Sequence, residues 1–423
     1  MSETPKPIHP LRIAPIDAPT LASVKPLPPA APGGIEPYRV LFPIGAALAI
    51  VGVGLWLASP LAGFPWPGRL HAALLAQGFE LCFVTGFLLT AMPSFTHGAK
   101  CTPVELGLAT AGALAFATLQ FAGLEAAAQA GFVLALGVTA FAVLRRVRWG
   151  AAAPPEEFLL AGVGLVLGLL GGLHQLAAAA GWLGEPHARF GVRLVSRGML
   201  LAVVLGLGGL LVPTFAMVKD PLRIVGVARA GQRGPRRVYV LALAALVAGA
   251  FFADTADRHT LAAWMRAVAA IASTMLSWKS WSRPAKGGAL TTALWLSGWA
   301  IVLGVVGAAV FPAHEIAAWH VVFVGGFGLL TMAIGTRVTV THGGHPATDE
   351  PRVLGWASLA LLGAALVLRA AGGEVDPSRA GWLAAAAFAW VAAWGLWLAG
   401  ALPRALRTAK RDPGLMMPGR AKR

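Results

Sequence analysis

The sequence predicts an all-α membrane protein, a polytopic transmembrane bundle of about 12 helices. Of its 423 residues, 57% are hydrophobic and only 12% are charged, and the mean hydropathy is +0.70. A soluble globular protein carries about 25% charged residues and could not bury so much apolar surface. The composition therefore excludes a soluble enzyme and a disordered regulator. The apolar runs also lack the alternation of a membrane β-barrel, so helices are expected.

Twelve apolar runs follow one another from Leu41 onward, each about as long as the ~20 residues that a bilayer core requires. The third and fourth runs are the least distinct pair, because almost no polar sequence separates them. The expected spans lie near residues 41–59, 71–93, 104–122, 124–144, 158–182, 190–216, 238–254, 259–281, 289–311, 315–341, 353–371 and 380–402.

The spans divide the chain into three regions. Residues 1–37 hold ten of the thirty prolines and are expected to form an extended, disordered cytoplasmic tail, with a partner-binding arm as the alternative. Residues 38–403 are the transmembrane domain. Residues 404–423 form a basic cytoplasmic tail, which would contact anionic membrane lipids and not nucleic acid.

The formal net charge of +16 indicates orientation, because Lys and Arg gather in alternate gaps between the spans. The basic-rich gaps are residues 145–148, 219–237 and 279–286, and the C-terminal tail continues this series. The opposite gaps hold few basic residues: Arg69, Arg189, Arg258 and Arg379. The positive-inside rule therefore predicts that both termini lie in the cytoplasm.

Histidines in the outer halves of three separate spans are candidate metal or haem ligands. His71 begins the second span, His174 lies roughly 12 Å inside the fifth, and His320 lies roughly 8 Å inside the tenth. Two imidazoles from different helices at similar depth can clamp a haem iron, and three can hold copper. Packed histidines, each bonded to a carbonyl across a helix contact, are the alternative. No Cys-x-x-Cys-His motif occurs, which excludes a covalently attached c-type haem.

A second histidine group lies at the inner end of the spans. His97, His342 and His345 fall there, with Arg337 one helical turn or more before His342. This group is interpreted either as a second ligand set or proton entry, or as interfacial histidines beside a snorkelling arginine.

Charged residues inside the spans need partners. Arg197 lies deep in the sixth span, where a haem propionate or an acidic side chain such as Glu185 would pair with it. Arg266 raises the same question in the eighth span. Glu80 is the main intramembrane carboxylate, and it could relay protons, pair with an arginine or make a helix–helix hydrogen bond.

Two stretches carry a resemblance to a known family. His71 precedes GFLLTAMPSFTHG, and His320 lies within WHVVFVGGFGLLTMAIGTRVTVTHGG. Each stretch ends on Thr-His-Gly, which fits either a duplication or low-complexity sequence. With these motifs the chain resembles the NnrS family, bacterial membrane proteins of about twelve helices that contain haem and copper and are linked to the nitric oxide response. Ala73 and Leu74 stand where that family has His and Glu.

The resemblance implies a bacterial inner-membrane protein that binds haem b, with copper as a further cofactor. His71, His174 and His320 are the expected ligands, His342 is an additional metal ligand, and Arg197 is a cofactor contact. Nitric oxide is the implied small-molecule ligand, and membrane lipids are the implied surroundings.

The chemistry itself is left open by the sequence: ligand binding, metal-centre repair and redox turnover all fit, and no catalytic residue is assigned. The alternative from another class is a secondary transporter without haem, which would have broken helices and a polar site at the membrane midplane.

Overall fold

Long apolar runs in lipid satisfy their backbone polar groups only by forming helices, and this is what the chain does. The computed structural model describes residues 35–62, 67–216, 233–284, 287–372 and 380–407, and the regular elements within these ranges are all helices. In the first half they are α1 (Pro37–Ala62), α2 (Gly68–Ala73), η2 (Leu74–Phe79), α3 (Glu80–Thr96), α4 (Pro103–Phe121), α5 (Glu125–Trp149), α6 (Glu157–Ala179), α7 (Glu185–Arg193), η3 (Leu194–Met199) and α8 (Leu200–Phe215). In the second half they are α9 (Arg233–Thr255), α10 (His259–Ala272), η5 (Ser273–Ser277), α11 (Ala289–Val310), η6 (Pro312–His314), α12 (Glu315–His320), η7 (Val321–Gly328), α13 (Leu329–His342), η8 (Ala347–Asp349), α14 (Glu350–Val353), α15 (Trp356–Ala371) and α16 (Ala380–Leu406).

The predicted membrane bundle is confirmed. Within the described ranges, eleven helices are long and apolar enough to cross a membrane, and the pair η8–α14 and α15, bent by 41°, supplies a twelfth span. The third and fourth spans are two separate helices, α4 and α5. They are joined through Gly123, whose φ of +73° lies in the left-handed region that glycine adopts without strain.

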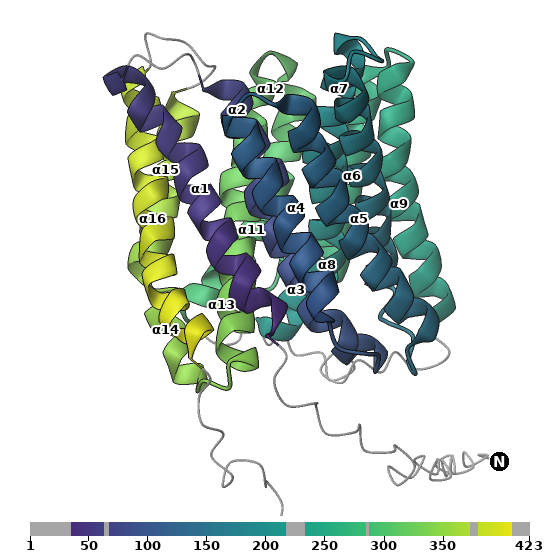
Figure 1. Cartoon of the computed structure of the whole chain (residues 1–423), viewed down its shortest axis with the longest axis vertical. Coiled ribbons are helices and arrows are strands. Elements are labelled where there is room, and N and C mark those ends of the chain that lie inside the picture. Colours follow the sequence, from purple (N-terminus) through teal and green to yellow (C-terminus); the bar gives the residue numbers. More distant parts are fainter. Residues whose placement is uncertain (1–34, 63–66, 217–232, 285–286, 373–379, 408–423) are drawn as a thin grey trace, which may run out of the picture. The chain divides into compact units, whose positions relative to one another are not determined.

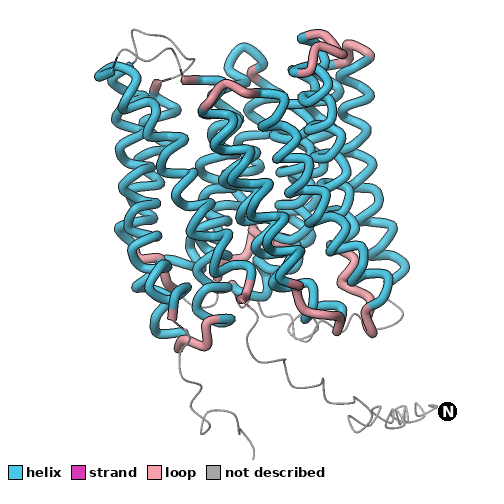
Figure 2. The backbone as a smooth tube through the Cα atoms, viewed as in Figure 1, coloured by secondary structure: helices cyan, strands magenta, loops and turns pink. Residues whose placement is uncertain are grey.

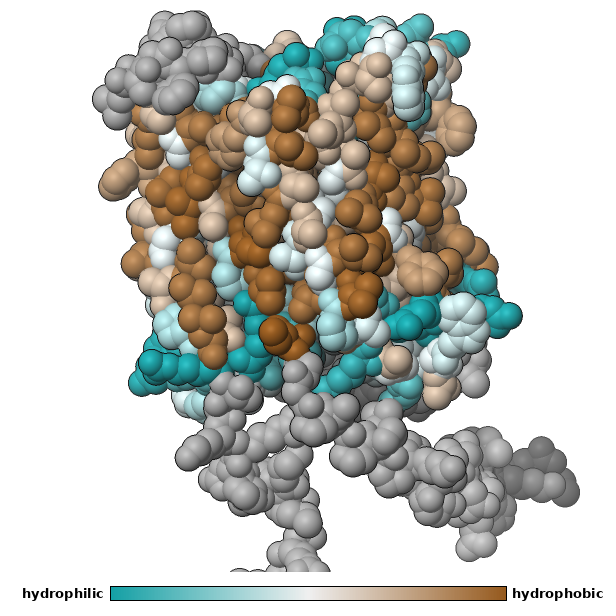
Figure 3. Space-filling view, in the orientation of Figure 1, coloured by the Kyte–Doolittle hydropathy of each residue, from teal (hydrophilic) through white to brown (hydrophobic). Residues whose placement is uncertain are grey.

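The helices run side by side between two ends, which we call upper and lower as drawn in Figures 1 and 2. The short helices α2, α7 and α12 lie at the upper end, and the loop between α3 and α4 lies at the lower end. On the face in view, hydrophobic residues fill the middle of the helices and hydrophilic residues gather at both ends, as Figure 3 shows. This is the pattern of a multi-pass membrane protein, with lipid around the apolar band.

The spans form three groups of four. Each group starts with a helix that packs against the next span: α1 on η2 and α3, α6 on η3 and α8, and α11 on η7 and α13. Each group ends with a packed pair: α4 with α5, α9 with α10, and α15 with α16. The groups meet through α5 and α6, α10 and α11, and α16 and α1, so the twelve spans close into a ring.

The second member of each group has an unusual construction. It begins at the upper end with a short α-helix, passes through a π-helical segment (η2, η3 or η7), and continues as an α-helix. These spans are the most buried of the eleven continuous spans. In their apolar stretches 78%, 83% and 61% of the residues are buried, whereas the share is at most 50% in the others. The shared pattern of the His71 and His320 spans therefore extends to a third span, Glu185–Phe215.

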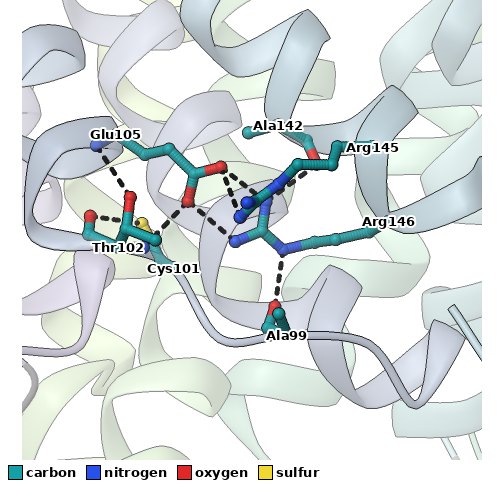
Figure 4. A network of polar contacts seen from close by, with 7 residues as sticks. All are labelled: Ala99, Cys101, Thr102, Glu105, Ala142, Arg145 and Arg146. Atoms are coloured by element: carbon teal, nitrogen blue, oxygen red, sulfur yellow. Dashed lines mark hydrogen bonds and ion pairs between the residues drawn. The ribbon is translucent and has the colours of Figure 1, made fainter. Parts of the chain in front are cut away.

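Glu105 holds α4 to α5 at the lower end (Figure 4). It forms a capping box with Thr102: the Glu105 N–H donates to Thr102 Oγ1 at 3.2 Å, and the Thr102 N–H donates to Glu105 Oε2 at 2.8 Å. The same carboxylate pairs with Arg145 and Arg146, each at 2.9 Å. Arg146 also donates to the carbonyl of Ala99 at 2.9 Å. One carboxylate thus joins a helix start, a loop and the neighbouring helix.

The two predicted tails lie almost wholly outside the described residues, which begin at residue 35 and end at residue 407. The region between them forms one unit by its internal contacts. Cys82 and Cys101 are both free thiols.

Candidate functional site

A cavity of about 1000 Å³ opens in the upper half of the bundle between the spans that contain η2, η3 and η7. We call these three the π-helical spans, although the eighth span also ends in a π-helical segment, η5. Such a volume lies at the upper end of the range for small-molecule and cofactor sites, about 300–1,000 Å³. Its rim includes Arg69 and Glu185, whose side chains are exposed and form an ion pair at 3.4 Å. Its apolar wall is mostly aliphatic, and it includes five aromatic side chains: Trp56, Phe79, Phe323, Phe327 and Trp390.

The π-helical segments explain why polar residues reach this cavity. A π-helical turn holds an extra residue, which changes the face that the following positions present, and such turns occur frequently at functional sites. Gln77 of η2 and Arg197 of η3 both line the cavity. Gln77 exchanges two amide hydrogen bonds with Gln129 of α5, at 2.8 and 3.2 Å.

His71 lines the cavity from α2. Its Nδ1 lies 3.0 Å from the carbonyl oxygen of Gly52 in α1, and Trp56 packs edge-on against the ring at 5.7 Å between centroids. Because a carbonyl only accepts hydrogen bonds, Nδ1–H is the donor, and in the neutral ring Nε2 keeps its lone pair.

His320 lines the same cavity from α12, directly before η7. Its Nδ1–H donates to the carbonyl of Ile316 one turn earlier, at 2.7 Å, and Phe323 packs edge-on at 6.1 Å. Neither this Nε2 nor that of His71 has a hydrogen-bond partner among the described residues. The structure therefore brings two imidazoles from different spans to one cavity, each held through Nδ1, which is the usual second-shell arrangement of a metal-ligating histidine.

Arg197, the expected cofactor contact, also lines the cavity. Its anionic partner is Glu315 of α12, so the proposal of Glu185 as its partner was wrong. The guanidinium lies 5.1 Å from the ring centroid of Trp319, the residue before His320. Glu185 instead pairs with Arg69 and lies 4.0 Å from Arg189. Two ion pairs thus join the upper ends of the three π-helical spans.

His174 is not among the residues that line the cavity. Its ring lies parallel to that of His187, with an interplanar angle of 8° and 3.3 Å between the two Nδ1 atoms. Phe190 packs edge-on against it at 5.3 Å. His174 therefore forms a separate histidine pair with α7 and does not join His71 and His320.

His342 lies at the lower end, the opposite end from the cavity, where its ring centroid is 6.2 Å from that of Tyr38. The group expected around it is dispersed. Arg337 pairs with Glu350 at 2.9 Å, and His345 bonds the carbonyl of Arg404 at 3.1 Å. Among the described residues, no three or more His, Cys, Asp or Glu side chains come together as a metal site.

Several polar residues that were not singled out from the sequence also line the cavity, among them Gln77, Glu315 and Arg369. Arg369 is 7% exposed although it lies near the end of an apolar helix, α15. Its signal in the sequence is an arginine close to an apolar run, but without the three-dimensional arrangement it cannot be told from a snorkelling end residue.

Comparison with known proteins gives one finding that concerns the whole bundle. Residues 35–408 match the family described as NnrS protein, a range that contains every helix from α1 to α16. No curated protein matches the chain.

Proposed function

The chain belongs to the NnrS family, and from this premise we propose that it is a membrane protein that binds haem b between His71 and His320 and serves in the response to, or tolerance of, nitric oxide. The haem and the nitric oxide role are implied by the family. The choice of these two histidines rests on the cavity.

The observation that carries the proposal is that the His71 and His320 rings make the same kind of hydrogen bond at the same cavity. Each imidazole donates Nδ1–H to a backbone carbonyl, at 3.0 Å for His71 and 2.7 Å for His320, and each belongs to a wall of the same cavity. Neutral imidazole with Nδ1 protonated presents Nε2 as a ligand. It brings no charge into the bilayer, so the site is compatible with membrane depth.

The remainder of the cavity suits a flat, apolar molecule that carries carboxylates. Aliphatic and aromatic side chains form its apolar wall, and the guanidinium groups of Arg197 and Arg369 line the same space. Guanidinium groups bind carboxylates through charge-assisted, often bidentate, hydrogen bonds. Arg197 and Arg369 would therefore hold the propionates of a haem, which would supply the iron for chemistry with nitric oxide.

Copper has less support from the described residues. His174 and His187 form a pair and not a trio, and His342 lies at the other end of the bundle. We therefore propose haem alone at the cavity, with His174 outside it.

The test is an absorption spectrum with iron analysis of the full-length protein purified in detergent. The proposal predicts a Soret band that His71→Ala or His320→Ala removes or strongly alters. The matched control, His174→Ala, should leave the band unchanged. A colourless wild-type protein would contradict the proposal and favour the haem-free transporter.

We further propose that the protein lies in the bacterial inner membrane with the lower end facing the cytoplasm. The lower end carries most of the basic residues of the described helices and loops, among them Arg145, Arg146, Arg148, Arg404 and Arg407, and positive loops face the cytoplasm. A fluorescent protein fused at the C-terminus should therefore be fluorescent in cells. An alkaline phosphatase fusion that is active there instead would contradict the orientation.

A further inference from the structure

Glu80 is an acidic residue deep in the cavity. It is the first residue of α3, directly after η2, and lies in the middle of the 29-residue span Gly68–Thr96. Only 6% of the residue is exposed, and it lines the cavity. Together with Leu200, Phe327 and Trp390, it is among the lining residues furthest from the upper end of their spans.

The partner of Glu80 differs from those of the other buried glutamates. In the part of the chain that the structure describes, three glutamates are buried: Glu80, Glu105 and Glu157. Glu105 pairs with two arginines, and Glu157 pairs with Arg236. Glu80 accepts one hydrogen bond, from Thr331 Oγ1 at 3.2 Å, and the described residues place no Lys or Arg nitrogen within ion-pair distance of it.

This difference bears on the charge of the group. A carboxylate that is largely withdrawn from water and has no cation beside it is disfavoured relative to the neutral acid. A neutral carboxyl needs only a neutral partner, and the Thr331 hydroxyl is one. The cavity is also lined by other charged or titratable groups: His71, Glu125, Arg189, Arg193, Arg197, Glu315, His320, Arg369 and the Arg69–Glu185 pair.

We propose that Glu80 is a neutral carboxylic acid that gives its proton to, and recovers it from, a ligand held in the cavity between His71 and His320. The ligand's position rests on the proposed function. When the ligand gains negative charge, the O–H bond of Glu80 breaks and the proton passes to the ligand. Glu80 remains as a carboxylate that accepts the Thr331 hydrogen bond. The electron that charges the ligand comes from an external one-electron donor, and the proton transfer itself consumes no further oxidant or reductant.

The proton is replaced from the upper end. The cavity leads from Glu80, at its deep end, to a rim whose Arg69 and Glu185 side chains are exposed to water. Towards the lower end, the next polar pair is Thr85 and Thr139, which are buried and bonded to each other at 3.0 Å.

The first test measures the protonation state alone. Infrared spectra of the full-length purified wild type and of Glu80→Gln are recorded at neutral pH and subtracted. The difference should show the carbonyl stretch of a protonated carboxyl that is present in the wild type, shifts in ²H₂O and is absent from Glu80→Gln. The matched control is Glu105→Gln, which should leave this band in place because Glu105 is ion-paired. If the band is absent from the wild type, or survives in Glu80→Gln, the proposal is overturned.

Thr331→Val keeps the proposal falsifiable if Glu80→Gln does not fold. Loss of the hydroxyl donor should move the carbonyl stretch of Glu80 to higher frequency without removing it. A band at an unchanged frequency would show that the carboxyl is not the one that Thr331 contacts.

The second test measures proton transfer. The midpoint reduction potential of the coloured wild-type protein should fall by up to about 59 mV for each unit by which the pH rises. In Glu80→Gln the potential should depend less steeply on pH. An equal slope in both proteins overturns the transfer step. A colourless protein would instead refute the haem, which the infrared test does not require, so the two failures are distinguishable.

Discussion

Replacing Glu105 by Gln is expected to destabilise the bundle by about 3 kcal/mol, the lower end of the range for breaking a buried ion pair. The Arg146 side chain is 1% exposed and would keep its charge without a carboxylate. The loss is limited because Arg146 also donates to the carbonyls of Ala99 and Ala142, at 2.9 and 2.8 Å. Equilibrium unfolding in mixed detergent, followed by circular dichroism, measures the change.

The matched control for this experiment is Arg189→Gln. Arg189 and Glu185 are 66% and 53% exposed and lie 4.0 Å apart, so this pair should contribute less than about 1 kcal/mol. The double variant Glu105→Gln/Arg146→Met should lose less stability than the sum of the two single variants, since each removes the same contact. Equal stability of Glu105→Gln and Arg189→Gln would refute the assignment of Glu105 as the tie between α4 and α5.

Three further perturbations test the packing and the chemistry. Gly112→Ala should lower the free energy of unfolding by about 1–3 kcal/mol in an unfolding titration, because the added Cβ would lie 2.7 Å from a backbone oxygen of α5. Gly107→Ala on the same helix is the control: its Cβ meets nothing within 4 Å, so the change should be neutral or mildly stabilising. Arg266→Met should lower the free energy of unfolding by about 3–5 kcal/mol, because the buried carboxylate of Asp254 loses its cation. The double variant Arg266→Met/Asp254→Leu should recover much of this loss. Burial, with Glu105 as a further cause, raises the pKa of the Cys101 thiol to about 11, so maleimide labelling should be slow at pH 7 and rise with pH; fast labelling at pH 7 would contradict this.

The spans could be predicted from the sequence because the membrane sets their length and excludes unpaired backbone. Even the poorly separated pair α4 and α5 is found as two helices. The bend between α14 and α15 could not be predicted, because hydropathy records where a segment is apolar and not in which direction its axis runs.

The candidate site was predicted only in part. Depth along a span can be counted from the sequence, so His71, His174 and His320 all stood out. The direction in which a ring points depends on the rotation of its helix, and the π-helical turns near His71 and His320 change that rotation. His174 therefore matches His320 in depth but bonds to His187. Arg369 could not be found from the sequence because it shares the cavity with His320 and His71, which lie about 50 and 300 residues away in the chain.

An experimental density map of the full-length protein in lipid nanodiscs, prepared from the coloured fraction, tests the central claim most directly. The account predicts a flat macrocycle whose metal lies between Nε2 of His71 and Nε2 of His320, with its carboxylates toward Arg197. A macrocycle bound at His174, or a cavity whose two imidazoles point away from each other with no density between them, would contradict it.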